Sequence, residues 1–214
     1  DLHDVEADAG GGDRPHDALV CIAQGRRLVE EDRPRVSPEH RFKTAAEMTA
    51  LFEDKKTGGF YLTGSDVPAL LVRTRPGFDG AIPSGNAVAV TELLRLAELT
   101  GRRDWAAAAE KTLAFYQQEL TQQGLSLTEL LIGADGWLGP RSEAVIAGDS
   151  RDPDTQRMVR CLRGHFLPRT VVLLRDASRD AQRLERIAEP VQGRLPIHAK
   201  PTMYLCEDFA CREP

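Results

Sequence analysis

The chain has 214 residues, 41% of them hydrophobic and 29% charged, a balance typical of a globular protein rather than a disordered or fibrous one. A formal net charge of -5 argues against general nucleic-acid binding, which needs a basic face to replace phosphate counterions. No run approaches the roughly 20 apolar residues that span a bilayer, so no membrane partner is expected. Four cysteines are too few for a secreted disulfide scaffold, so the default expectation is a reducing, cytoplasmic compartment.

The first 16 residues are acidic and glycine-rich, and we expect residues 1–16 to form a flexible segment. They lack the basic and apolar parts of a signal peptide. The first residue is not Met, so we expect the chain to be processed, trimmed or a piece of something longer. A helical pattern begins at Asp17, and a second helix is predicted over about 38–53, where Ser37 and Pro38 form a typical helix start.

A long irregular stretch, residues 53–80, links this helix to the next one. Gly58 and Gly59 allow positive φ angles, and "FYLT" and "LLVRT" are short strand-like runs that could pair. Long ordered loops of this kind often carry function.

Two further helices are predicted on either side of "TGRRD". The first follows Ser84 and ends before Gly101, and the second starts near Asp104. Apolar residues recur at helical spacing from Trp105 to Leu120, which is the clearest amphipathic pattern in the chain. Successive helical hairpins predict a helical array.

After about residue 126 the pattern changes to alternating strands and helices. The runs "EAVIAG", "RTVVLLRD" and "PTMYLCED" read as strands, and the segments between them read as helices. This alternation predicts parallel strands with right-handed crossovers. The expected fold class is therefore mainly α, with helical hairpins over residues 17–135 followed by a small α/β unit over residues 136–214.

The segment "FDGAIPSGN" holds the strongest candidate for a functional residue. Pro83, Ser84 and Gly85 are explained by the start of a helix, with Ser84 as its cap. That role does not explain Asp79 or Asn86, which are ordinary turn residues but could also accept and donate hydrogen bonds to a ligand. Both interpretations stay open from the residues alone. The candidates for acid–base chemistry are Asp66, Arg73, Asp79 and Glu129, and Asp79 is favoured among them.

Cys206 and Cys211 are separated by four residues, so they do not form the C-x-x-C motif of redox or zinc sites. Two thiolates cannot complete a tetrahedral zinc site, and we predict no metal or cofactor. The two cysteines are read as small, half-buried apolar residues or as a reversible disulfide, and both alternatives remain open.

Several segments together resemble the C-terminal part of the thioredoxin-domain-containing DUF255 family, which includes the bacterial YyaL and animal spermatogenesis-associated protein 20. They are "LFEDKKTGGFYLTGSD", "VRTRPGFDGAIPSGNAVAVTELLRLAELTG", "EAVIAGD" and "MYLCEDFACREP". The resemblance implies an N-terminal thioredoxin-like domain, absent from this chain. It further implies an (α/α)6 toroid similar to that of N-acylglucosamine 2-epimerases and six-hairpin glycosidases, of which this chain holds a part.

The resemblance also implies a carbohydrate-related function, with a sugar-like ligand and an epimerase- or glycosidase-like activity. Asp79 is then the catalytic candidate, and Trp137 an additional aromatic platform. The residues expected to bind the substrate are Phe60, Tyr61, Arg73, Ser84 and Asn86. One alternative is a non-catalytic, redox-linked scaffold or interaction module, in which Cys206 and Cys211 form a thiol pair that reacts with a thioredoxin-like partner domain. Another is a truncated product without independent activity.

Overall fold

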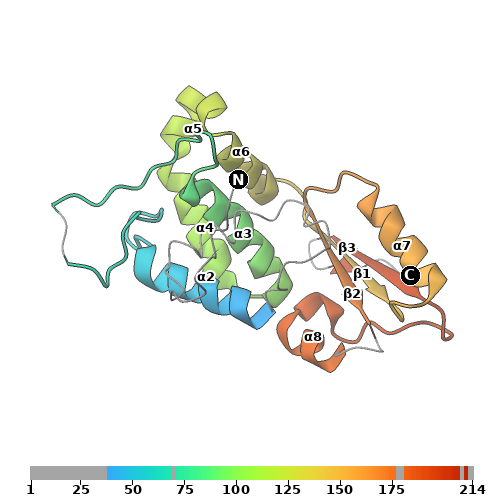
Figure 1. The fold of residues 1–214 in the computed structure, drawn as a ribbon. Coiled ribbons are helices and arrows are strands. Elements are labelled where there is room, and N and C mark those ends of the chain that lie inside the picture. The colour runs from blue at the N-terminus through green and yellow to red at the C-terminus, as the bar shows by residue number, and fades with distance from the viewer. Residues whose placement is uncertain (1–37, 69–70, 177–180, 208–209, 212–214) are drawn as a thin grey trace, which may run out of the picture.

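The computed structural model describes residues 38–68, 71–176, 181–207 and 210–211, and side chains from Phe42 onward. The predicted flexible segment at residues 1–16 and the helix expected from Asp17 lie outside the described residues. The chain forms a helical region and a sheet-containing unit that lie side by side (Figure 1). The elements of the helical region are α2 (Pro38–Phe52), α3 (Gly85–Thr100), α4 (Arg103–Phe115), α5 (Gln117–Gln123), η1 (Gly124–Ser126) and α6 (Thr128–Leu138).

The sheet-containing unit alternates strands with short helices, as the sequence predicts. Its elements are β1 (Ser142–Ala147), α7 (Pro153–Arg163), β2 (Thr170–Arg175), α8 (Ala181–Ile187), η2 (Glu189–Val191), β3 (Thr202–Glu207) and β4 (Ala210–Cys211). The prediction of a mainly helical chain with a small α/β unit is confirmed.

Helix α3 is the centre of the helical region, and it is buried along most of its length. The Ser84 side chain accepts a hydrogen bond from the backbone N–H of Ala87, which confirms the predicted cap. Gly101 ends the helix in the left-handed conformation, with φ 69°, and its N–H donates to the carbonyl of Ala97. Local sequence signals therefore set both ends of the helix around which the others pack.

Helices α4 and α6 pack against α3 and complete its hydrophobic cluster. The periodic run that begins at Trp105 forms α4 as predicted, but the chain breaks at Tyr116 before α5 begins. Helix α6 was not predicted, because two glycines interrupt its sequence and lower its helix propensity. Gly133 explains one of them: a Cβ at this position would lie 2.7 Å from Cγ1 of Val90, so only glycine lets α6 approach α3 this closely.

The sheet has four strands in the order β2-β1-β3-β4. Strands β1 and β2 are parallel, with Ser142 opposite Thr170, and α7 forms the crossover between them. Asp152 caps α7 by accepting a hydrogen bond from the N–H of Asp154. The predicted strand–helix–strand unit is confirmed for this pair of strands.

Strand β3 runs antiparallel to β1, which contradicts the prediction that all strands are parallel. Thr202, at the start of β3, pairs with Ala147, at the end of β1. The chain that follows β2, with α8 and η2, brings β3 to the sheet at the edge where β1 and β2 end, so β3 runs back along β1.

Two ion pairs join the sheet-containing unit to the helical region. Nε of Arg141, just before β1, lies 3.2 Å from the buried carboxylate of Glu98 on α3. Arg169, just before β2, binds both carboxylate oxygens of Asp135 on α6, at 2.8 and 2.6 Å. The starts of both parallel strands are therefore attached to helices of the other region.

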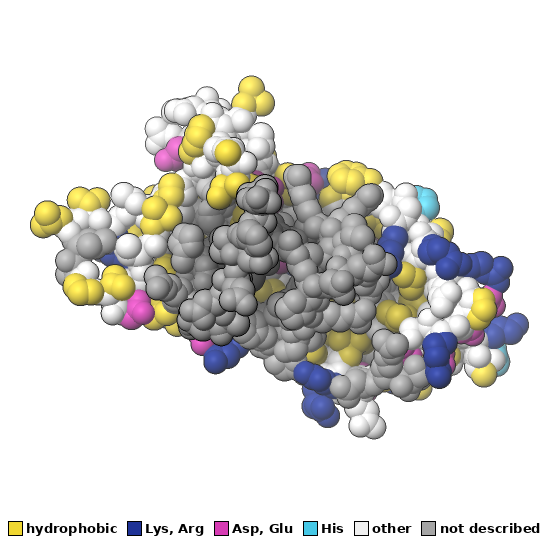
Figure 2. Space-filling view, in the orientation of Figure 1, with side chains coloured by type: hydrophobic (Ala, Val, Ile, Leu, Met, Phe, Trp, Pro, Cys, Tyr) yellow, Lys and Arg dark blue, Asp and Glu magenta, His cyan; other side chains and the backbone are white. Residues whose placement is uncertain are grey.

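The stretch between α2 and α3 forms no strand among its described residues. The predicted runs "FYLT" and "LLVRT" are joined there by a backbone hydrogen bond from Leu62 to Thr74, and an isolated bridge pairs Glu53 with Phe60. This excursion projects from the helices and carries exposed apolar side chains, visible at one end of the molecule in Figure 2. They are Leu62, Val67, Leu71, Val72, Phe78 and Ile82. No helix in the described part of the chain combines the length and hydropathy needed to cross a bilayer.

Candidate functional site

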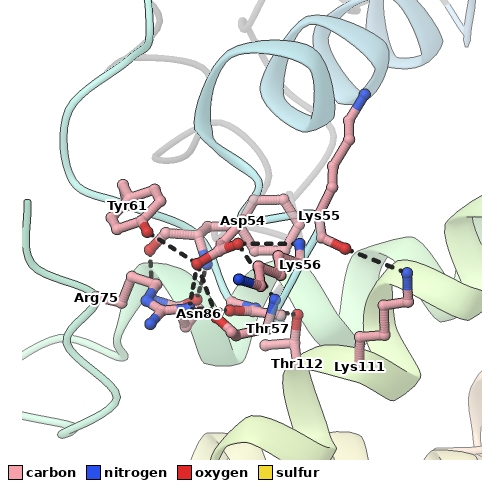
Figure 3. A network of polar contacts seen from close by, with 12 residues as sticks. Asp54, Lys55, Lys56, Thr57, Tyr61, Arg75, Asn86, Lys111 and Thr112 are labelled. Carbon is pink, nitrogen blue, oxygen red and sulfur yellow. Dashed lines mark hydrogen bonds and ion pairs between the residues drawn. The ribbon is translucent and has the colours of Figure 1, made fainter.

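The side chain of Asn86 fastens both ends of the long loop to the start of α3 (Figure 3). Its Oδ1 accepts a hydrogen bond from the N–H of Phe60 at 2.6 Å, and its Nδ2 donates to the carbonyls of Phe60 and Pro76. Asn86 is buried, with 2% of its surface exposed. Both amide protons are therefore used within the protein, so the structure places this predicted ligand-binding residue beneath the loop.

Asp54 is the central charged residue of the neighbouring hydrogen-bond network (Figure 3). Its carboxylate accepts hydrogen bonds from the hydroxyls of Thr57 and Tyr61, and it lies 3.0 Å from Nη1 of Arg75. Hydrogen bonds lower the pKa of Asp54 well below its usual range: the Thr57 hydroxyl is the largest cause, and the Tyr61 hydroxyl and the backbone N–H groups of Thr57 and Lys56 add to it. Arg75 also donates to the carbonyl of Gly58, so the network closes the turn after α2.

Gly58 explains why this turn sits so close to α4. Its φ is +88°, and a Cβ would lie 2.2 Å from the carbonyl oxygen of Lys111. The hydroxyl of Thr112 accepts the N–H of Gly59, which joins the turn to the same helix. The predicted positive φ angles at Gly58 and Gly59 are confirmed.

Asp79, the predicted catalytic residue, connects the starts of α3 and α6. Its Oδ1 accepts the N–H of Ser84 at 2.8 Å, and its Oδ2 accepts the N–H of Glu129 at 2.8 Å. The hydroxyl of Thr128 adds a third contact at 3.3 Å. Both carboxylate oxygens are thus engaged by protein donors, an arrangement that caps α6 from a distant segment.

The other predicted substrate-binding residues are also held by the protein. The guanidinium of Arg73 lies 4.0 Å from the ring centroid of Tyr61 and donates to the carbonyl of Thr63. Phe60 and Ser84 are buried, with 2% and 7% of their surfaces exposed. The structure therefore brings the predicted set together around one loop, with Tyr61 and Arg73 as its half-exposed members.

The remaining acidic and aromatic candidates lie apart from one another. Asp66 is exposed on the loop, the backbone of Glu129 takes part in the Asp79 contacts, and Trp137 packs on the helical core. Within the described ranges, no group of three or more His, Cys, Asp or Glu side chains is placed to hold a metal ion.

A hollow of about 360 Å³ lies between the end of α2 and one face of α4, next to the Asp54 network. Trp105 borders the hollow but is buried, with 1% of its surface exposed. Phe42 stacks on its ring with 6.1 Å between ring centroids, and the guanidinium of Arg102 lies 3.9 Å from the centroid. The indole Nε1 has no hydrogen-bond partner among the described residues. The full lining is Thr49, Ala50, Glu53, Lys55, Asp104, Trp105, Ala107, Ala108 and Lys111.

Two carboxylates of this hollow have pKa values shifted in opposite directions. Burial raises the pKa of Glu53, and the positive charges of Lys55 and Lys111 partly oppose that change. Hydrogen bonds from Arg102 lower the pKa of Asp104. Both carboxylate oxygens of Asp104 accept hydrogen bonds from Arg102, whereas Glu53 is half-buried at the end of α2.

Sequence reasoning missed the hollow because its members come from two helices. Asp104 was read only as a helix start and Trp105 only as part of an apolar helix face. Glu53 directly follows a predicted helix and precedes a run of two lysines, which gave no distinctive signal. An aromatic residue beside an acidic one at a helix start was the only local hint.

Cys206 and Cys211 face each other across β3 and β4 and form a disulfide. Cys206 is buried, with 5% of its surface exposed, and Cys211 is exposed. Nη2 of Arg194 lies 2.7 Å from Sγ of Cys211. Of the two alternatives that the sequence left open, the structure has the disulfide.

Curated relatives confirm the resemblance drawn from the motifs. The chain is 28% identical to human spermatogenesis-associated protein 20 over 165 residues, covering 77% of this chain and 21% of the human protein. It is 28% identical to the rat protein of the same name over 168 residues, covering 77% of this chain and 21% of the rat protein. The chain therefore spans about a fifth of the length of these relatives. No family model matches the chain.

A short part of the chain is also similar to an unrelated protein. The chain is 54% identical to DNA polymerase III subunit alpha of Caulobacter vibrioides over 39 residues, covering 18% of this chain and 3% of the polymerase subunit. A match to so small a part of the subunit carries no inference about activity.

Proposed function

We propose that this relative of spermatogenesis-associated protein 20 binds a sugar-like small molecule in the hollow between α2 and α4. The helical hairpins would belong to an α/α toroid that the rest of a longer protein completes. The observation that supports the proposal most is the meeting of two carboxylates with opposed pKa shifts and two lysines at one hollow. Carboxylates accept hydrogen bonds from the hydroxyls of sugars, and lysine ammonium groups donate to their oxygens.

Each wall of the hollow supplies a different contact to such a ligand. Trp105 underlies the hollow, with 1% of its surface exposed, because Phe42 stacks on its ring and the guanidinium of Arg102 lies 3.9 Å from the ring centroid. Lys55 and Lys111 supply positive charge for electronegative groups, as in an N-acyl sugar. In an epimerase- or glycosidase-like reaction, Glu53 would exchange the proton, and Asp104, held by Arg102, would stay charged and accept hydrogen bonds from the ligand.

Asp79 is the alternative centre that the sequence favours. Its contacts to Ser84 and Glu129 make it a residue that shapes the loop, whereas Tyr61 and Arg73 present half-exposed groups on the loop surface. A ligand that replaced one of these internal contacts would bind there instead. The hollow and the loop therefore make different predictions for the same binding experiment.

The test is thermal melting of the whole chain against a panel of sugars and N-acyl sugars, repeated with Glu53→Gln and Asp79→Asn. A ligand present at 100 times its Kd stabilises the folded state by about 2.7 kcal/mol. We expect a sugar-specific rise in Tm that Glu53→Gln abolishes and Asp79→Asn retains. The matched control is Glu110→Gln, which removes an exposed carboxylate of α4 outside the hollow.

Each outcome separates the alternatives. Loss of the shift in Asp79→Asn alone contradicts the hollow and supports the loop. A cooperative melt that no sugar moves contradicts sugar binding by this chain and favours the non-catalytic scaffold. Absence of a cooperative melt favours a truncated product without independent activity.

A further inference from the structure

The disulfide lies on the face of the sheet that α8, η2 and the chain after them cover. Val145 of β1 pairs with Tyr204 of β3, and both pack in the small cluster with Ala188 and Val191. Side chains alternate between faces along a strand, so Cys206, two residues beyond Tyr204, points to the same side. Cys211 is its direct partner on β4 and shares that side.

The segment after η2 places a positive charge beside Sγ of Cys211, an exposed residue. Arg194 lies 5.4 Å from the ring centroid of Tyr204, and the hydroxyl of Tyr204 donates to the carbonyl of Leu195. These contacts aim the guanidinium at Cys211, where Nη2 is 2.7 Å from Sγ. Among the described residues, Arg194 makes no ion pair with a carboxylate, so its charge is directed at sulfur.

The two sulfurs differ in the property that decides thiol–disulfide exchange. Cys211 is exposed on the two-residue strand β4 at the sheet edge, whereas Cys206 is buried on β3. An incoming thiolate must reach the sulfur that it attacks, and a nearby cation stabilises a cysteine thiolate. Both conditions hold at Cys211.

We propose that Cys206–Cys211 is an exchangeable disulfide that reacts with a dithiol through Cys211. The thiolate of the dithiol attacks Sγ of Cys211, the bond between the two sulfurs breaks, and Cys206 leaves as a thiolate that takes up a proton. The second thiol of the dithiol then attacks the first sulfur of the same dithiol, which is bonded to Cys211 in the mixed disulfide. Cys211 is released as a thiolate. The partner dithiol is oxidised to a disulfide, and Cys206 and Cys211 are reduced to thiols.

The position of Arg194 decides which of the two cysteines exchanges with the partner. In the second step, the guanidinium stabilises the departing Cys211 thiolate. In the reverse reaction, it keeps Cys211 ionised as the nucleophile that attacks a partner disulfide. Cys206 acts as the resolving cysteine in that direction, because it lies directly opposite on the neighbouring strand.

The experiment follows glutathione adducts by mass spectrometry on the whole chain in a Cys21→Ser background. Reduced protein is mixed with oxidised glutathione, which is the probe. In Cys206→Ser we expect a stable adduct on Cys211, formed faster than the adduct on Cys161. Cys161 is an exposed free thiol of α7 and serves as the internal control. In Cys211→Ser we expect Cys206 to react more slowly than Cys161, because it is buried.

Arg194 is tested in the same Cys206→Ser protein. Arg194→Gln should lower the rate at Cys211 about three- to tenfold at pH 7 and leave it unchanged near pH 9, where the thiol ionises without help. Arg194→Lys should restore much of the rate at pH 7. Cys161 should react at the same rate in all variants, and circular dichroism checks that each one is folded.

Three results would overturn the proposal. One is a Cys211 that reacts no faster than Cys161, and another is a Cys206 that reacts as fast as Cys211. The third is a disulfide in the unmutated chain that reduced glutathione and dithiothreitol leave intact under native conditions, which would make the bond purely structural. None of these outcomes depends on whether the chain binds a sugar.

Discussion

Among the described residues, eighteen buried hydrophobic residues form one cluster in the helical region, residues 38–138, whereas three form the cluster of the α/β unit, residues 142–211. The first region can supply its own stability through apolar burial. The second depends more on its sheet hydrogen bonds, on ion pairs to the helices and on the disulfide. Basic side chains also gather at the α/β end of the molecule (Figure 2). The α/β unit is therefore stabilised in part by its contacts with the helical region, and its stability should follow that of the helical region.

The largest expected effect comes from removing a core side chain of α3. Leu93 is fully buried, so Leu93→Ala should reduce the free energy of unfolding by about 2–5 kcal/mol. Leu173→Ala removes a partly buried side chain that packs against the cluster of the α/β unit, and it should cost less. Urea denaturation measures both. Equal losses would mean that the two regions are stabilised alike, which contradicts the comparison.

Breaking the junction between the two regions should have the next largest effect. Arg141→Gln removes the charge that faces the buried carboxylate of Glu98, with an expected loss of about 1.5–3 kcal/mol. Limited proteolysis should then cut the α/β unit first, because it loses one of its attachments to the helices. Arg95→Gln, which removes a solvent-exposed partner of Glu92, is the control and should change little. Early cleavage in the helical region would contradict the order of stability.

Asn86→Ala tests the connection within the helical region itself. The substitution leaves the N–H and carbonyl of Phe60 and the carbonyl of Pro76 without their partner, at a cost of about 1–3 kcal/mol. Hydrogen exchange should report faster opening at Phe60 and no change in the sheet. Faster exchange in β1 would show that the loop and the sheet open together.

The smallest effect concerns pH. The pKa of Asp54 is lowered in the folded state, so this group contributes stability above its unfolded pKa of about 3.9, and the contribution is lost as pH falls below that value. Asp54→Asn should therefore reduce the free energy of unfolding at pH 7 by about 0.2–1 kcal/mol. The difference from the unmutated chain should shrink between pH 4 and pH 2 in urea denaturation. A difference that stays constant with pH would exclude the carboxylate charge as its source.

Local signals in the sequence predicted much of the fold. Ser84 and Gly101 mark the ends of α3, and the periodic apolar residues from Trp105 onward mark α4. The direction of β3 was predicted wrongly, because it depends on where α8 returns the chain and not on the residues of the strand. Helix α6 was missed because packing on α3, at Gly133, outweighs its weak propensity.

The candidate site was less predictable than the fold. Asp79 and Asn86 were recognised as more than turn residues, but their partners lie 50 and 26 positions away along the chain. Spacing along a sequence carries no signal for such contacts. The hollow is harder to predict from the sequence, because Glu53 and Asp104 approach each other only after two helices have packed.

The contacts of Asn86 have a consequence for how the chain tolerates change in length. Phe60 and Pro76 are held by the same amide, so the residues between them form a segment whose two ends stay fixed whatever lies between. Lengthening a loop that is closed in this way costs only about 0.6 kcal/mol for each doubling of its length. Insertions between these two anchors should therefore leave α3 and α4 in place, so this part of the molecule can be exchanged between relatives as a unit.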